Sequence, residues 1–173
     1  MSLQALTNQQ ILDTHLYRWP RICIHPDIWN IPKILPNYQF TQWQEVKFEK
    51  NSIPLINHLE GQEGIYMFIA RPNSLPNSNH SFIMYIGETG NIKQRFEKYF
   101  TYKSTKHPSD QLKRRMVLVW KDYLYFQYIT TNFGNRAARE TLEYDLIDTI
   151  VPPMNDLFRS KILKSHLKSL KSI

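Results

Sequence analysis

Two apolar segments, GIYMFIA at 64–70 and SFIMYIG at 81–87, limit the folds open to this chain of 173 residues. Each segment is apolar at consecutive positions, and this pattern is typical of strands that are buried on both faces. The residues between them, RPNSLPNSNH, favour turns and predict a hairpin with an enlarged loop. Strands that are buried on both sides require cover on both sides, so the hairpin predicts a sheet covered by helices.

The residues after the hairpin predict three helices and one further strand. The first helix begins at about Asn91, which can cap it while Gln94 reaches back as in a capping box. A second helix is expected from about Ser109 to Trp120, and DYLYFQYITT then predicts a strand. A strongly amphipathic helix follows at 135–150 and is ended by two prolines.

This order of elements predicts an α+β fold, in which a small sheet is flanked by helices. We expect residues 1–60 to form an N-terminal extension, within which FTQWQEVKFEK is typical of a strand. Residues 61–156 would form the main domain, and residues 157–173 would form a basic C-terminal helix.

The net charge of +7 is distributed unevenly along the chain. Residues 1–63 hold five Lys or Arg against six Asp or Glu, whereas residues 93–121 hold nine basic and two acidic side chains. The sequence from position 157 onward holds five basic side chains and no acidic one. Such a field favours a polyanion, with nucleic acid as the first candidate and an anionic membrane surface as the second. A solvated surface that keeps the protein soluble is the alternative.

The composition excludes several classes of protein. Apolar residues make up 42% and charged residues 21%, which is typical of a soluble globular domain. No apolar run approaches the roughly 20 residues of a membrane helix, and MSLQALTNQQ lacks the pattern of a signal peptide. A single cysteine, Cys23, excludes an internal disulfide and a thiolate metal cage. We therefore expect a cytoplasmic protein without a membrane partner.

Two of the expected helices turn charged side chains toward the sheet. Glu143 lies on the apolar face of the helix at 135–150, and Arg136 and Arg139 extend the same stripe. Arg95 lies at the edge of the apolar face of the helix that begins near Asn91. A buried carboxylate must be paired, hydrogen-bonded or metal-bound, because an isolated buried charge costs several kcal/mol. Glu143 is therefore either the ion-pair partner of one of these arginines or part of a site that Arg95 shares.

Five features in this order resemble the GIY-YIG family of nucleases. They are GIY at 64–66, YIG at 85–87, the helix GNIKQRF at 90–96, Glu143 and Asn155. The nearest pattern is the nuclease domain of the bacterial excision-repair incision enzyme, and the resemblance covers residues 64–155. The residues on either side differ from that enzyme, so we expect a stand-alone nuclease of restriction type or mobile-element type.

The resemblance implies an antiparallel sheet flanked by helices and a DNA endonuclease that uses one divalent cation, Mg²⁺ or Mn²⁺. It assigns the metal to Glu143 and the scissile phosphate to Arg95. Tyr66 and Tyr85 would orient or deprotonate the attacking water, and Asn155 would support the catalytic site. These assignments suit the chemistry, because a guanidinium can bind two phosphate oxygens and a carboxylate is the ligand that such a cation prefers. A tyrosine base would need a pKa below its usual value near 10.

Basic and glycine residues supply the expected DNA contacts. Gly87 and Gly90 would let a phosphate approach the backbone beside a helix N-terminus. The segment GETGN lacks the Gly-Lys-Ser/Thr ending of a P-loop, so we expect no nucleotide cofactor. The sequence leaves the formation of a homo-oligomer open. The candidate contacts are Gly87, Lys93, Lys98, Lys103, Lys113, Arg114, Arg115, Arg136 and Arg139.

Two alternatives to this function remain at the level of the sequence. Pro26 and Asp27 together with Glu45 and Lys47 have the spacing of a PD-(D/E)xK nuclease site, although such a short pattern arises often by chance. The other alternative is a non-catalytic nucleic-acid-binding protein that keeps the fold and uses its basic residues as phosphate contacts.

Overall fold

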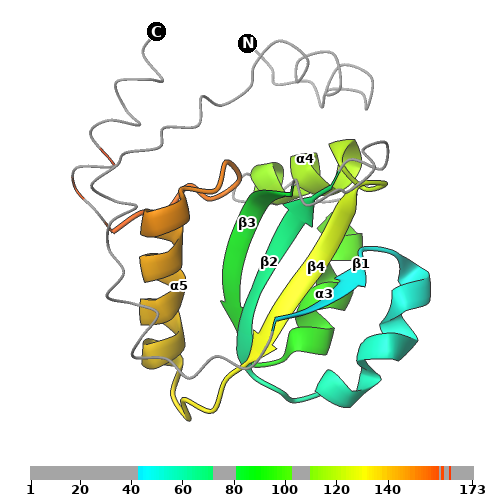
Figure 1. Ribbon diagram of the computed structural model, residues 1–173, viewed down its shortest axis with the longest axis horizontal. Helices are drawn as coiled ribbons and strands as arrows, with labels where there is room; N and C mark the ends of the chain where they lie inside the picture. The colour runs from blue at the N-terminus through cyan, green and yellow to red at the C-terminus, as the bar shows by residue number, and fades with distance from the viewer. Residues whose placement is uncertain (1–42, 72–80, 103–109, 160, 162–163, 165–173) are drawn as a thin grey trace, which may run out of the picture.

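The centre of the molecule is a four-stranded antiparallel sheet with the strand order β1-β4-β2-β3. The computed structural model describes residues 43–71, 81–102, 110–159, 161 and 164 (Figure 1). The sheet confirms the expected α+β fold, its antiparallel strands and the hairpin; the loop residues 72–80 of that hairpin lie outside the described residues. The strands are β1 (Gln44–Lys47), β2 (Gly64–Ala70), β3 (Phe82–Thr89) and β4 (Leu124–Thr130).

Helices cover both faces of the sheet (Figure 1). One face carries the 3-10 helix η2 together with α3 and α4, and the other carries α5. The helices that the sequence predicts after the hairpin are confirmed, with ends that differ by one or two residues. The helical elements are η2 (Lys50–Leu59), α3 (Ile92–Thr101), α4 (Gln111–Val119) and α5 (Arg136–Ile150).

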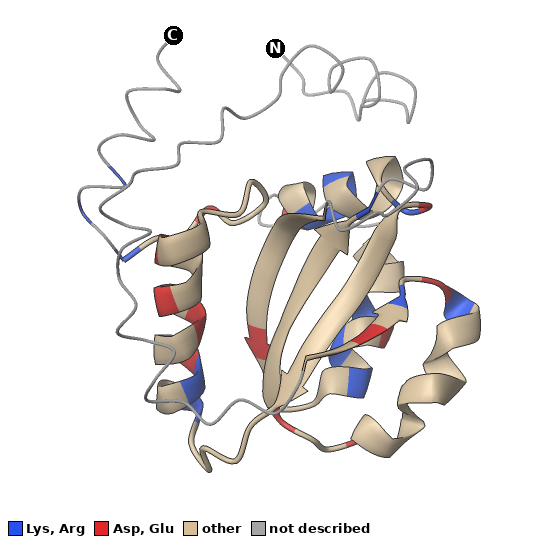
Figure 2. Cartoon of the chain, in the orientation of Figure 1, with Lys and Arg blue, Asp and Glu red and all other residues tan. Residues whose placement is uncertain are grey.

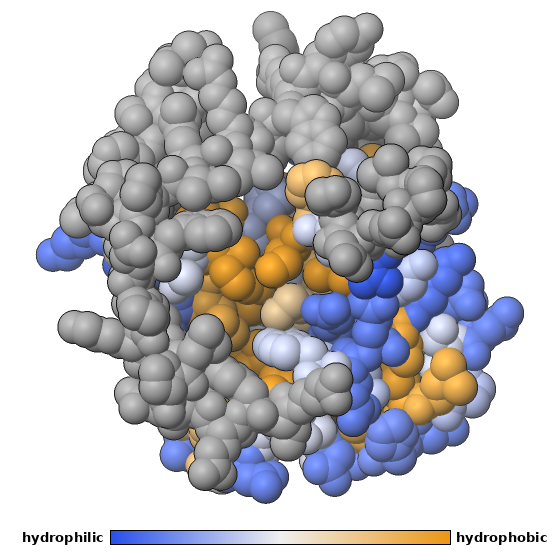
Figure 3. All heavy atoms as spheres, viewed as in Figure 1, coloured by the Kyte–Doolittle hydropathy of each residue, from blue (hydrophilic) through white to orange (hydrophobic). Residues whose placement is uncertain are grey.

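The central strand β2 supplies two separate apolar cores. All seven of its residues are buried, as expected for a strand with cover on both faces. Tyr66 and Phe68 point into the core under α3 and α4, whereas Ile65 and Met67 point into the core under α5. Figure 3 shows apolar side chains gathered over the sheet beside α5. The hairpin therefore places its alternate side chains against two different sets of helices.

Part of the segment expected as an N-terminal extension lies on this sheet. β1 pairs with β4 along its whole length, and Ile56 and Leu59 of η2 are buried in the core under α3. Residues 1–42 lie outside the described residues, as does almost all of the expected C-terminal helix. None of the helices in the described part of the chain has the length and apolar character needed to cross a bilayer.

The first turn of α3 differs from the expected capping box in one respect. Asn91 caps the helix as predicted, because its side chain accepts a hydrogen bond from the Gln94 backbone N–H at 3.1 Å. The prediction for the Gln94 side chain was wrong, because this side chain donates to Glu60 at 3.1 Å and does not bond the Asn91 backbone. The Asn91 N–H donates to the Thr89 hydroxyl at 3.0 Å, so the reciprocal bond has no donor left. At α5 the cap is Asn135, which accepts from the Ala138 N–H at 2.8 Å.

Candidate active site

The hairpin places Tyr66 and Tyr85 on the face of the sheet that α3 covers. Tyr66 lies opposite Gly87 in the register of β2 and β3, and the two tyrosine rings have centroids 6.2 Å apart. A Cβ atom at Gly87 would lie 2.4 Å from the Tyr66 hydroxyl oxygen. Gly87 therefore leaves room for the Tyr66 side chain, which gives this glycine a role in packing that the sequence analysis did not assign.

Four tyrosine side chains pack against one another on this face of the sheet, and we call them the tyrosine cluster. It comprises Tyr66, Tyr85, Tyr99 and Tyr102. The Tyr66 and Tyr99 hydroxyl oxygens are 3.0 Å apart and share a hydrogen bond. Sequence reasoning placed Tyr99 on the apolar face of its helix and missed its hydroxyl, because helical spacing gives the face and not the polar partner.

Burial opposes the ionisation of these tyrosines. It raises the pKa of Tyr66 and of Tyr99 well above their usual range, and it raises the pKa of Tyr85 to about 12. The hydroxyls are therefore protonated at neutral pH and act as hydrogen-bond donors and acceptors. Of the two roles expected for Tyr66 and Tyr85, this environment favours orienting a water molecule over removing its proton.

Arg95 projects from α3 toward this cluster. Its guanidinium carbon lies 6.0 Å from the centroid of the Tyr66 ring, and its positive charge acts to lower the pKa of Tyr66 and of Tyr85. Burial raises the pKa of Tyr102, and the charge of Arg95 acts against that rise. A half-buried guanidinium held beside protonated hydroxyls can still offer several N–H donors to an anion.

Glu143 approaches the same cluster from α5 on the other side of the sheet. Burial and, next, the charge of Glu88 raise the pKa of the Glu143 carboxyl to about 7, against a hydrogen bond with the Glu88 backbone and the charge of Arg95. The Glu143 charge in turn acts to raise the pKa of Tyr85 and of Tyr66. The charges of Glu143 and Arg95, from two different helices, thus act in opposite directions on the same two tyrosine hydroxyls.

The outer edge of β3 explains how Glu143 can reach this position. β3 is an edge strand, so the outward backbone groups of alternate residues need partners from outside the sheet. The Met154 N–H donates to the Met84 carbonyl at 2.9 Å. The Asn155 side chain accepts from the Ile86 N–H and donates to the Ile86 carbonyl, both at 2.9 Å. Met154 and Asn155 in the segment after α5 thus close this edge of β3, while α5 itself packs against β3.

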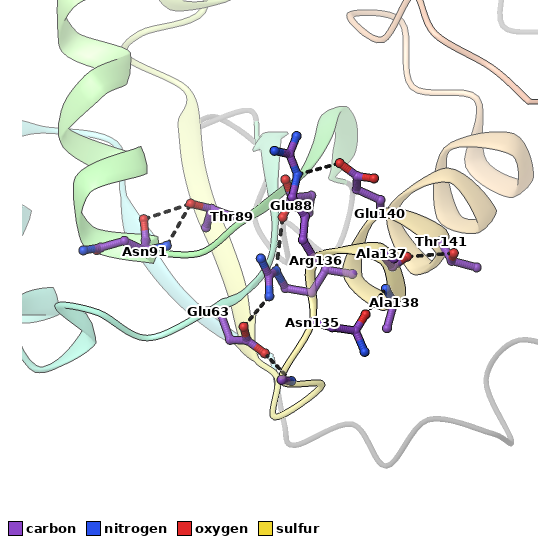
Figure 4. A network of polar contacts seen from close by, with 12 residues as sticks. Glu63, Glu88, Thr89, Asn91, Asn135, Arg136, Ala137, Ala138, Glu140 and Thr141 are labelled. Carbon is purple, nitrogen blue, oxygen red and sulfur yellow. Dashed lines mark hydrogen bonds and ion pairs between the residues drawn. The ribbon is translucent and has the colours of Figure 1, made fainter.

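Arg139 forms a buried ion-pair network with Glu63 and Glu88, the two carboxylates labelled in Figure 4. Only 8% of its side chain is exposed. Its Nη1 donates to Glu63 and its Nε donates to Glu88 at 3.1 Å, while Glu63 also accepts from the Gly134 N–H at 3.1 Å. Because its guanidinium is covered and doubly paired, Arg139 is poorly placed to contact DNA, unlike the exposed candidates.

Arg136 lies only three residues earlier and has the opposite environment. Its side chain is 75% exposed and pairs with Glu140 at 2.7 Å on the surface of α5. Neither arginine of the stripe forms an ion pair with Glu143, which rules out the alternative of a plain ion pair between Glu143 and one of them.

The Arg139→Met variant is expected to lose about 2–4 kcal/mol of unfolding free energy, because it leaves the Glu63 and Glu88 carboxylates without their cation in a largely covered site. The matched control is Arg136→Met, which removes an exposed pair and is expected to change stability by less than about 0.5 kcal/mol. Urea unfolding followed by circular dichroism measures both. Equal losses in the two variants would contradict the assignment of a buried network.

The other basic candidates lie mainly on α3 and α4 (Figure 2). Lys98 is exposed, whereas Lys93 is half-buried and pairs with Glu60 at 3.1 Å. Arg114 and Arg115 are half-buried on α4. Lys103 lies outside the described residues.

In the alternative PD-(D/E)xK pattern, the Glu45 carboxylate is already bound by other side chains. Both oxygens of Glu45 accept from Arg71 at 2.8 Å, and Gln127 donates to one of them at 2.9 Å. The Lys47 Nζ atom lies 3.9 Å from the Glu49 Oε2 atom. Asp27 lies outside the described residues. A carboxylate bound by a bidentate guanidinium is a poor metal ligand, so the described part of this pattern does not form a site.

Glu143 is the side chain that best fits a divalent cation. The described residues contain no group of three or more His, Cys, Asp or Glu side chains that could hold a metal ion. Mg²⁺ is often held by one or two carboxylates, with substrate phosphates and water completing its coordination. A half-buried carboxylate whose pKa is raised to about 7 gains from a cation beside it, so Glu143 fits such a site.

The four-stranded antiparallel sheet carries two tyrosines on its β2–β3 hairpin and is flanked by an arginine-bearing and a glutamate-bearing helix, the arrangement expected of a nuclease-type domain. The family model for the GIY-YIG catalytic domain matches residues 62–155, more than half of the chain. The chain therefore belongs to the GIY-YIG nuclease superfamily. Comparisons with curated proteins and with solved structures gave no match.

Proposed function

We propose that the chain is a metal-dependent DNA endonuclease that hydrolyses phosphodiester bonds with Mg²⁺ or Mn²⁺. The observation that carries this proposal is the position of Glu143, a half-buried carboxylate beside Arg95 and the tyrosine cluster with its pKa raised to about 7. A site that only binds DNA would gain nothing from this arrangement, because the carboxylate repels phosphate. A cation held by Glu143 removes that conflict.

Each side chain has a distinct task in this proposal. The Arg95 guanidinium binds non-bridging oxygens of the scissile phosphate and stabilises the charge that develops on them. The Tyr66 and Tyr85 hydroxyls, protonated at neutral pH, orient the attacking water by hydrogen bonds. Asn155 holds the β3 backbone at Ile86, between Tyr85 and Gly87, and acts as a positioning residue. When bound, a divalent cation supplies further positive charge for the phosphate oxygens as a Lewis acid.

Exposed and half-buried basic side chains would bind the DNA backbone. We assign this role to Lys93, Lys98, Arg114, Arg115 and Arg136. We also assign it to Lys103, which lies outside the described residues. Phosphate contacts of this kind predict binding that weakens steeply with salt. By analogy alone, we further propose a restriction-type or mobile-element-type role in the cytoplasm.

Incubation of the purified protein with supercoiled plasmid tests this function. We expect nicked or linear DNA in the presence of Mg²⁺ or Mn²⁺ and none when EDTA is present. A non-catalytic binding protein would instead retard the plasmid in a salt-sensitive manner and leave it supercoiled with every metal. If Asp27→Ala abolished cleavage and Glu143→Ala did not, the PD-(D/E)xK alternative would replace this proposal.

A further inference from the structure

Lys113 is a cation from α4 that lies against the tyrosine cluster. Its ammonium nitrogen is 5.9 Å from the centroid of the Tyr85 ring and 5.6 Å from that of Tyr102. Only 22% of the Lys113 side chain is exposed. The sequence analysis counted Lys113 among the general DNA contacts, but this position sets it apart from the exposed Lys98 on α3.

Arg95 and Lys113 approach the cluster from two different helices. Arg95 lies over the ring of Tyr66, whereas Lys113 lies over the rings of Tyr85 and Tyr102. Tyr85 lies beside both Tyr66 and Tyr99. The cluster is thus bordered by one guanidinium, one ammonium and, through α5, the Glu143 carboxylate.

The acidic partner of Lys113 binds it weakly. Asp110 lies three residues earlier, and the two charged groups make a single contact of 3.4 Å. Pairs of this kind on a helix surface contribute a few tenths of a kcal/mol, so an anion that enters the cluster can compete for the ammonium. The ring faces of Tyr85 and Tyr102 hold the ammonium in place without neutralising it.

We propose that Lys113 is a further catalytic residue, which contacts the scissile phosphate and stabilises the additional negative charge of the transition state. This inference rests on the proposed nuclease function. Hydrolysis adds the hydroxyl of water to phosphorus, breaks the bond between phosphorus and the leaving sugar oxygen, and transfers a proton to that oxygen. Lys113 forms no covalent bond and transfers no proton; its ammonium binds a non-bridging oxygen while Arg95 binds others.

Steady-state cleavage of supercoiled plasmid with Mg²⁺ tests this role. The Lys113→Gln variant is expected to lose about a hundredfold in kcat while KM stays within about threefold, because the contact strengthens in the transition state. Lys113→Arg keeps the positive charge and should recover most of the rate. The matched control is Lys98→Gln, in which we expect a raised KM, a smaller salt dependence of binding and little change in kcat.

Asp110→Asn separates catalysis from a merely structural ion pair. It breaks the contact with Lys113 but keeps the ammonium, so kcat should stay within about threefold of the wild-type value. An equal loss of kcat in Asp110→Asn and Lys113→Gln would overturn the proposal, as would a Lys113→Gln effect confined to KM. Thermal unfolding of each variant checks that the fold is kept. Wild-type protein without cleavage would refute the proposed function itself, whereas active wild-type and active Lys113→Gln protein would refute only the role of Lys113.

Discussion

The Glu143→Gln variant is expected to lose metal-dependent DNA cleavage by about a thousandfold, because glutamine cannot supply the anionic ligand of the cation. Glutamine keeps the size of the side chain and an oxygen that can accept the hydrogen bond of the Glu88 backbone. The measurement is the rate of plasmid nicking at saturating Mg²⁺ and Mn²⁺. Glu140→Gln on the same helix is the matched control and should retain activity, because Glu140 pairs with the exposed Arg136.

A second measurement on Glu143→Gln distinguishes a lost metal ligand from a damaged fold. The pKa of the Glu143 carboxyl is about 7 in the folded protein and 4.5 in the unfolded chain. Ionisation of this carboxyl therefore lowers the stability of the folded state. Below pH 4.5 both states are protonated and the penalty vanishes; it grows as the pH rises toward 7 and is complete above it. Without metal at pH 8, Glu143→Gln should therefore be more stable than the wild type by roughly 1–3 kcal/mol. A destabilised variant would contradict this assignment.

Replacing Arg95 with alanine is expected to reduce kcat by about 10²- to 10³-fold, since the guanidinium is positioned beside Tyr66 to bind charge that develops on the phosphate. Arg95→Lys should recover only part of the loss, because an ammonium cannot form the paired hydrogen bonds of a guanidinium. Single-turnover cleavage measures the chemical step directly.

Lys98→Ala is the matched control for Arg95, because Lys98 lies on the same helix and is exposed. It should weaken DNA binding and leave the single-turnover rate nearly unchanged. DNA affinity measured in EDTA completes the comparison. If Arg95→Ala lowered affinity alone, with an unchanged single-turnover rate, Arg95 would be a backbone contact and not part of the catalytic machinery.

The sequence predicted most of the secondary structure correctly because the relevant signals are local. Seven consecutive buried residues in β2 follow from the unbroken apolar run at 64–70. The starts of α3 and α5 follow from Asn91 and Asn135, whose side chains cap the next turn. The predicted capping box does not form, because the Gln94 side chain donates to Glu60, which is distant in the sequence.

The residues around Glu143 were harder to predict because their partners come from distant segments. A helical wheel gives Arg136 and Arg139 the same stripe, yet one is exposed and the other is buried. Glu63 and Glu88, which bind Arg139, lie at the ends of β2 and β3 and carry no periodic signal. The sequence therefore did not identify the two acidic side chains that bind Arg139.

The amino-acid sequence determined the strands, the helices after the hairpin and the inward lean of Arg95 and Glu143, because spacing along the chain fixes those faces. It also determined the family, since the motif residues occur in their required order. Only the tertiary structure decided which of these groups are charged and what each one contacts. Burial raises the pKa of Glu143 and of Tyr85, and both effects depend on segments that the chain brings together over long sequence distances.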